Sequence, residues 1–427
     1  MAISVPSATS YESLLADAID YAVAEGADVI NMSLSICSNF GVIRDAVEDA
    51  FDAGVVLVAS SGNFPSGGHN PNGGCPEGLV YPAAYPEVIA VGAVPFDGRR
   101  WELSHPDLAA SAGNVGWFLT APGGELIPVA DRDSPFPQNY NYDYGGTSAA
   151  GPHVAGVAAL VRSVAPGLSP TEVADILTQS ADPAGCAEND DIPNAYTLAQ
   201  ECGWGLLDAE AALDLALDRV FTDLGGRFAG DFVIPAGETV TAGAVTLEFG
   251  PAARLIVEGT LDATGTVFVS ESNDGWHGIR VQGGDATLSG AIVDVNAAFD
   301  PSAGLTSPPT PAVAVTAGGH LVLDGTNVIG VKAAPGRPGT AGVVASGTGS
   351  YAEVVSGSEI QTHEGWGLQA LAGGQIFMDG EITRVASTDA GGALADGVGS
   401  RVTIAGGRVE TSQGPGLLAT MGGWVRV

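Results

Sequence analysis

The chain has 427 residues, which is enough for two or more domains, and 45% of them are hydrophobic, which is ample for buried cores. Its 49 acidic residues outnumber 15 basic ones and give a net charge of −34. This balance argues against a nucleic-acid partner, which needs basic patches, and suits an exported or salt-exposed protein. The sequence contains no apolar run of membrane-spanning length.

The chain alternates helical and strand-like segments over its first hundred residues. Apolar residues recur at helical spacing in the helices, which end near Gly26 and Gly54, and are continuous in the strands. The segments are 12–25 (helix), 29–35 (strand), 42–52 (helix), 55–59 (strand) and 88–94 (strand). This order predicts a parallel α/β sheet with helices on both faces. Ligands of such sheets bind at the carboxyl ends of the strands, where Ser33 and Asn63 lie.

A tight glycine turn precedes a further helical segment. Gly145 and Gly146 permit close backbone approach, and residues 154–161 have helical character. The start of a helix offers amide donors and a positive dipole end, which favour a nearby oxyanion or alkoxide. Ser148 is therefore a candidate nucleophile. The alternative is that Thr147 or Ser148 only caps the helix.

The segment 145–156 reads Gly-Gly-Thr-Ser-Ala-Ala-Gly-Pro-His-Val-Ala-Gly. It resembles the nucleophile motif of the subtilisin-like serine peptidases and departs from it mainly at Ala149, where the family usually has methionine. The resemblance implies that Ser148 is the catalytic serine. It also implies that His153 occupies a structural position, packed on the helix, and is not the general base.

Four upstream segments match the same family in order. They are Val-Ile-Asn-Met-Ser-Leu at 29–34, the strand that ends at Gly62-Asn63, Tyr-Pro-Ala-Ala-Tyr-Pro at 81–86 and Val-Ile-Ala-Val-Gly-Ala at 88–93. The resemblance implies that Asn63 donates to the oxyanion, a contact whose loss typically costs about 100- to 1000-fold in rate. It further implies that Ser33, Leu34, Ser35 and Gly62 bind the substrate. Ser35 stands where the family usually has glycine.

Two further features bear on the cleft that the resemblance implies. Val80 lies near the family position at the base of the P1 pocket, which is often glycine, so we expect a shallower pocket that disfavours large aromatic side chains. The stretch from Asp131 to Tyr144 is polar and rich in tyrosine, and we expect it to be a loop beside the cleft. The segment 202–209 resembles the end of the peptidase domain, so the resemblance spans residues 10–217.

A serine nucleophile needs a base and a group that orients the base. In this family both precede the helix that begins here near Glu12, in the motifs Asp-(Thr/Ser)-Gly and His-Gly-Thr-His-Val-Ala-Gly. Neither motif occurs in this sequence. His69 and His105 lie downstream of the family position, and neither is assigned the role. We expect the base and its acid upstream of Met1, and we expect the chain as written not to hydrolyse peptides.

The sequence contains four cysteines, Cys37, Cys75, Cys186 and Cys202. None is in a Cys-x-x-Cys pair, so zinc is not expected, and we predict neither a metal nor a cofactor. Three disulfide pairings are possible, of which Cys37 with Cys75 and Cys186 with Cys202 is the most local. Disulfides would indicate an oxidising compartment, and four buried thiols are the alternative.

Short apolar segments between glycines replace the helices after residue 217. Gly342, Gly367, Gly392 and Gly416 each open such a segment and are 25, 25 and 24 residues apart. A period near 25 with several short strands predicts a solenoid, with alternate side chains pointing inward. We expect a right-handed parallel β-helix, since the segment resembles β-helix repeats of secreted bacterial proteins. A β-sandwich array is the alternative.

Each later repeat contains a second strand, as in Gln375–Gly380 and Arg401–Gly406. The segments Arg254–Gly259 and His320–Gly325 are interpreted as earlier copies of this second strand. Two stretches are expected to be loops that protrude from the coils, 308–311 and 333–340.

These patterns predict a partial subtilisin-like peptidase domain at 1–217 and a parallel β-helix at 218–427. The expected function is that of a secreted or cell-surface serine endopeptidase that cleaves proteins or peptides through an acyl-enzyme on Ser148. The alternative is a catalytically silent surface protein that binds a polysaccharide or a surface partner through its β-helix. Sedolisin-type acid peptidases also use a Gly-Thr-Ser serine but have Asp at the oxyanion position, so Asn63 argues against them.

Overall fold

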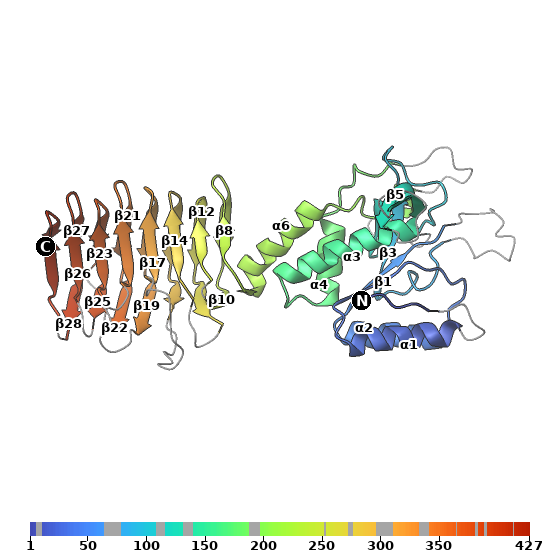
Figure 1. The fold of residues 1–427 in the computed structure, drawn as a ribbon, viewed down its shortest axis with the longest axis horizontal. Coiled ribbons are helices and arrows are strands. Elements are labelled where there is room, and N and C mark those ends of the chain that lie inside the picture. Colours follow the sequence, from blue (N-terminus) through green and yellow to red (C-terminus); the bar gives the residue numbers. More distant parts are fainter. Residues whose placement is uncertain are drawn as a thin grey trace. The chain divides into compact units, whose positions relative to one another are not determined.

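The computed structural model describes residues 1–5, 11–63, 78–107, 116–130, 140–187, 197–251, 253–271, 276–295, 311–332, 341–363, 365–380, 383–387, 391–412 and 414–427. The chain divides into two compact units, Met1–Leu217 and Asp218–Val427 (Figure 1). Among the helices in these ranges, none has the length and apolar character needed to cross a membrane.

A four-stranded parallel sheet in the order β1-β2-β3-β4 is the centre of the first unit. Its strands are β1 (Val29–Met32), β2 (Val56–Ser60), β3 (Val88–Val94) and β4 (Phe118–Pro122). Every residue of β2 and β3 is buried, as expected for parallel strands covered on both faces. The parallel α/β sheet predicted from the sequence is confirmed.

Helices cover both faces of this sheet (Figure 1). The helices of the unit are α1 (Tyr11–Ala24), α2 (Gly41–Asp52), α3 (Thr147–Val164), α4 (Pro170–Gln179), α5 (Leu198–Cys202) and α6 (Ala209–Arg219). Leu57 of β2 packs with Leu15 of α1 and Val47 of α2 in one buried cluster. Helix α3 packs against β2 and β3. The first helices and strands thus lie where the apolar periodicity predicts them.

Two predicted boundaries in this unit are wrong. Strand β1 ends at Met32, because the amide of Leu34 turns back to bond the Met32 carbonyl at 2.9 Å, so Ser33, Leu34 and Ser35 follow the strand. Residues 140–144, expected in a loop, belong to β6 (Tyr140–Gly146), which pairs antiparallel with β5 (Gly124–Ala130). The tyrosines favour a strand once a partner strand is present. Residues 131–139 lie outside the described residues.

One predicted disulfide is present. Cys186 and Cys202 are bonded with an S–S distance of 1.99 Å and a Cα–Cα distance of 5.9 Å, and both are buried. Cys37 is also disulfide-bonded, whereas Cys75 lies outside the described residues. The alternative of four buried thiols is therefore excluded.

The second unit consists of three eight-stranded parallel sheets, and each coil contributes one strand to each sheet (Figure 1). The first sheet contains β7 (Gly226–Phe228), β10 (Thr246–Phe249), β13 (Val267–Ser270), β16 (Ile292–Asp294), β19 (Asn327–Lys332), β22 (Glu359–His363), β25 (Arg384–Ser387) and β28 (Arg408–Thr411). The second contains β8 (Phe232–Ile234), β11 (Leu255–Val257), β14 (Ile279–Gln282), β17 (Val313–Thr316), β20 (Val343–Ser346), β23 (Leu368–Leu371), β26 (Ala393–Asp396) and β29 (Leu417–Thr420). The third contains β9 (Thr239–Ala242), β12 (Thr260–Thr264), β15 (Asp285–Ser289), β18 (His320–Asp324), β21 (Tyr351–Val355), β24 (Gln375–Met378), β27 (Arg401–Ile404) and β30 (Trp424–Arg426). A short π-helix, η1 (Val220–Leu224), precedes them. The parallel β-helix is confirmed.

Alternate side chains of these strands fill the interior of the β-helix. Val343, Leu368 and Ala393 stand in register on three successive coils and are fully buried. Nearer the first coils, the rings of Phe249 and Trp276 stack with centroids 4.3 Å apart. Buried side chains stacked in register are the property that the 25-residue repeat predicts.

One of the two assigned repeat copies is wrong. The segment Arg254–Gly259 contains β11, which pairs with β14 in the second sheet. Gln375–Gly380 contains β24 of the third sheet, so Arg254–Gly259 is not a copy of it. The segment His320–Gly325 contains β18, which lies in the sheet of β24 as predicted. Short apolar segments of similar composition cannot be told apart without their pairing partners. The expected loops at 308–310 and 333–340 lie outside the described residues.

Candidate active site

Ser148 is the second residue of α3 and is half-buried. The turn before it requires glycine, because Gly146 has φ +78° and a Cβ there would lie 3.0 Å from Nδ2 of Asn63. The first amides of a helix have no partner within the helix, and its dipole is positive at this end. The backbone around Ser148 can therefore stabilise a negative oxygen.

Asn63 is joined to the start of α3 through Thr147. Its Oδ1 accepts hydrogen bonds from the Thr147 amide at 2.9 Å and from the Thr147 hydroxyl at 2.6 Å. The same hydroxyl accepts a hydrogen bond from the Gly62 amide at 3.3 Å. Because two donors meet Oδ1, the amide orientation is determined, and Nδ2 is the side of Asn63 that can donate elsewhere.

The end of β1 approaches α3 through a second set of contacts. The Asn31 side chain donates to Ser33 Oγ at 3.0 Å, and Ser33 Oγ donates to the Ser148 carbonyl at 2.9 Å. A Cβ on Gly151 would lie 2.9 Å from Asn31 Oδ1, so strand and helix are in close contact here. Ser33 is thus fixed beside Ser148.

The other predicted substrate-binding residues lie further from Ser148 along the chain. The Leu34 carbonyl accepts a hydrogen bond from Ser60 Oγ at 3.3 Å, so Leu34 is linked to the end of β2. Ser35 is exposed. Among the described contacts, Gly62 reaches the site only through Thr147. The sequence analysis missed Asn31, and for Thr147 it considered only a capping role.

In the described part of the chain, no hydrogen bond joins Ser148 Oγ to a histidine. His153 is exposed, so its expected packing on the helix is wrong, because position 153 lies outside the buried face that contains Val154 and Val157. Its Nδ1 lies 2.9 Å from the Ala149 carbonyl. His105 is buried and directed away from solvent. His69 lies outside the described residues.

Two further observations concern a side chain beside Gly62 and the described residues as a whole. Val80 is buried, and its Cγ2 lies 3.2 Å from the point where a Cβ on Gly62 would be. Within the ranges that the structure describes, no group of three or more His, Cys, Asp or Glu residues could hold a metal ion.

The β-helix has a groove of about 700 Å³ on β22, β25 and β28. Its lining is mostly polar and includes Gln361, Ser387 and Thr411. Arg384 lies within it and bonds Glu359 and Glu410, each at 2.6 Å. The hydrogen bonds that Arg384 donates to Glu410 lower the pKa of Glu410 below its usual value.

Comparison with known proteins places the first unit in a family. The sequence profile of the Subtilase family matches residues 2–205. Subtilisin DY of Bacillus licheniformis is 38% identical over 173 residues, which are 40% of this chain and 56% of that protein. The halolysin-like extracellular serine protease Nep of Natrialba magadii is 34% identical over 202 residues, which are 47% of this chain and 30% of that protein.

Among solved structures, the self-cleaved protease domain of PatA is 30% identical and is matched over 48% of this chain and 68% of that one, with a TM-score of 0.37. The chain spans about half, or less, of the length of the curated relatives described above. The profile match lies within the unit that carries Ser148 and Asn63. Residues 2–205 of this chain belong to the subtilase family.

Proposed function

We propose that this chain carries the nucleophile and the oxyanion donor of a secreted serine endopeptidase. The observation that supports the proposal is the pair of hydrogen bonds from Thr147 to Asn63 Oδ1, at 2.9 and 2.6 Å. They couple the candidate donor directly to the residue that precedes Ser148. Nucleophile and donor therefore keep a fixed relation, as a reaction through a tetrahedral intermediate requires.

In the proposed reaction, Ser148 Oγ attacks the carbonyl carbon of the scissile peptide bond as a base takes its proton. The negative oxygen that forms accepts hydrogen bonds from Asn63 Nδ2 and from the backbone amides at the start of α3. The base then gives the proton to the leaving amine, and water hydrolyses the acyl-enzyme on Ser148. Losing the Asn63 donor would lower the rate about 100- to 1000-fold.

The base and its acid come from outside residues 1–427 in this proposal, since neither family motif occurs in the sequence. Ser33, Leu34 and Ser35 would bind the substrate backbone, because they follow β1 and Ser33 Oγ bonds the Ser148 carbonyl. Gly62 would complete the binding surface. The proposed substrates are proteins or peptides, and the proposed location is outside the cell.

Labelling with a fluorophosphonate tests this proposal without the missing base. The reagent reacts with an activated serine, and free imidazole in the buffer can act as the general base. We expect mass spectrometry to find the label on Ser148 at a rate that rises with imidazole concentration. We expect Asn63→Ala to lower that rate about 100-fold. Ser163→Ala, which changes another serine of α3, serves as control. Equal labelling of a Ser148→Ala protein would overturn the proposal.

The second candidate function is a catalytically silent surface protein that binds through its β-helix. The observation that favours it is the polar groove around Arg384. Binding of a soluble polysaccharide that is abolished by Arg384→Ala, together with an unreactive Ser148, would favour this candidate over the first.

A further inference from the structure

We propose that His105 is a positioning residue that holds Asn63 and the Gly78–Val80 segment in place beside Ser148. This inference rests on the proposed role of Asn63 as oxyanion donor. His105 belongs neither to the segment that ends at Asn63 nor to the Gly78–Val80 segment. It would therefore influence Ser148 only by holding these two segments in place. His105 is 1% exposed, which distinguishes it from a histidine that exchanges protons with substrate.

His105 forms two hydrogen bonds that join the chain on either side of residues 64–77. Its backbone amide donates to the Gly62 carbonyl at 3.0 Å. Its ring Nδ1 lies 2.7 Å from the Gly78 carbonyl. Because a carbonyl oxygen can only accept, Nδ1 carries the proton in this contact. One residue therefore fixes both Gly62, next to Asn63, and Gly78, the first residue of the Gly78–Val80 segment.

The imidazole also packs directly on the backbone of Gly62. This residue has φ +116°, and a Cβ on it would lie 2.9 Å from Cγ and 3.0 Å from Nδ1 of His105. The Val80 amide donates to the Ser61 carbonyl at 3.2 Å, which ties the second segment to the first. A change in the ring position would consequently be transmitted to the residue before Asn63.

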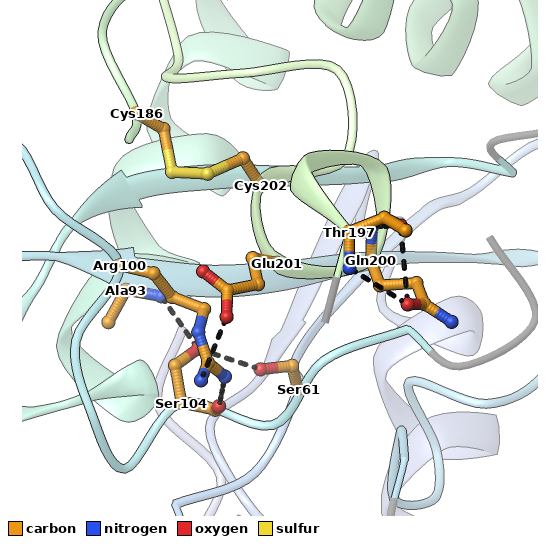
Figure 2. Close-up of polar contacts among 9 residues, drawn as sticks. All are labelled: Ser61, Ala93, Arg100, Ser104, Cys186, Thr197, Gln200, Glu201 and Cys202. Carbon is orange, nitrogen blue, oxygen red and sulfur yellow. Dashed lines mark hydrogen bonds and ion pairs between the residues drawn. A yellow bond between two sulfur atoms is a disulfide. The ribbon is translucent and has the colours of Figure 1, made fainter. Parts of the chain in front are cut away.

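Arg100 and Ser104, just before His105 in the sequence, are held in the protein interior (Figure 2). Ser104 Oγ accepts a hydrogen bond from the Ala93 amide of β3 at 3.1 Å and lies 3.5 Å from Ser61 Oγ. Arg100 donates to the Ser104 carbonyl and forms an ion pair with Glu201 at 3.6 Å, and both charged side chains are buried. Losing one partner of a buried pair is strongly destabilising, so this anchor is held firmly.

Glu201 belongs to α5 and directly precedes the disulfide-bonded Cys202 (Figure 2). The anchor of His105 thus extends from the disulfide through Arg100 to the end of β2. This arrangement gives the ring a rigid support, as expected for a group whose task is to fix other groups.

Three variants of the full chain separate positioning from packing. His105→Asn places an amide donor where Nδ1 was, His105→Gln places it beyond that point, and His105→Leu fills the space without a donor. We expect the Asn variant to keep its imidazole-dependent labelling rate within about threefold. We expect the Leu and Gln variants to lose about 100-fold, since a 1 Å misplacement of catalytic groups can cost that much. His320→Leu, on the β-helix, serves as control.

A spectroscopic measurement decides the inference even if Ser148 proves unreactive. The side-chain amide resonances of Asn63, assigned with Asn63→Ala, are expected to shift in His105→Leu and to stay in place in His105→Asn. If Ser148 is unreactive in the parent protein but the Asn63 resonances shift in His105→Leu, the proposed function is refuted. The positioning of Asn63 by His105 then still stands. Unchanged resonances in the Leu variant would overturn the inference, as would equal shifts in the Asn and Leu variants. If the Leu variant does not fold, the Gln variant takes its place in the comparison.

Discussion

The hydroxyl of Thr147 is the shortest link between Asn63 and the helix that carries Ser148, and Thr147→Val removes it with almost no change in shape. The hydroxyl donates to Asn63 Oδ1 at 2.6 Å and accepts from the Gly62 amide at 3.3 Å, and Thr147 is fully buried. The variant leaves the Gly62 amide without this acceptor. A buried polar group that loses its partner costs about 1–3 kcal/mol.

We expect the unfolding temperature of the first unit to fall by about 2–12 °C, at about 2–4 °C per kcal/mol for a unit of this size. We also expect imidazole-dependent labelling of Ser148 to slow by about 10-fold, because Asn63 keeps the bond from the Thr147 amide but loses the second one. Calorimetry and mass spectrometry measure the two effects. Thr147→Ser, which retains the hydroxyl, should approach the parent protein in both.

Thr178→Val is the matched control for this experiment. Thr178 is also a buried threonine on a helix, but its hydroxyl donates to the Ala174 carbonyl of α4, away from Ser148. Its loss should lower stability and leave the labelling rate unchanged. A Thr147→Val protein that is labelled as fast as the parent would refute the reasoning, because Asn63 would then be positioned without the hydroxyl.

Three further predictions concern stability. Replacing both Cys186 and Cys202 by serine should cost about 3 kcal/mol in denaturant unfolding, because the disulfide closes a loop with a sequence separation of 16. Leu57→Ala should cost about 2–5 kcal/mol in the same assay, because Leu57 is 1% exposed within the core. The hydrogen bond from Arg254 lowers the pKa of Asp231 in the folded protein below its ordinary value of 3.8. The ionised Asp231 therefore stabilises the folded state above pH 3.8, and this stabilisation is lost as the pH falls through the lowered pKa. Asp231→Asn should thus destabilise the β-helix at pH 6 more than at pH 2, measured by thermal unfolding; an equal effect at both would contradict this.

Local patterns in the sequence determined much of the architecture. Continuous apolar segments such as 55–59 predict buried parallel strands, because every side chain of such a strand is buried only when both faces of the sheet are covered. The 25-residue glycine spacing predicts a β-helix because each coil must bury its inner side chains against the next. The glycine turn before Ser148 and the motif around it likewise mark a candidate nucleophile from adjacent residues. All three features depend on neighbours in the chain.

The tertiary structure decided which distant residues meet. The bonds between Asn63 and Thr147 join residues 84 apart in the sequence, and the bond from His105 to Gly78 joins residues 27 apart. No periodicity encodes such pairs, because side chains at these separations are brought together only when the sheet and α3 pack. The strand at 140–146 depends in the same way on its partner β5. Sequence patterns thus single out Ser148 as the candidate nucleophile, while folding determines which groups contact its helix.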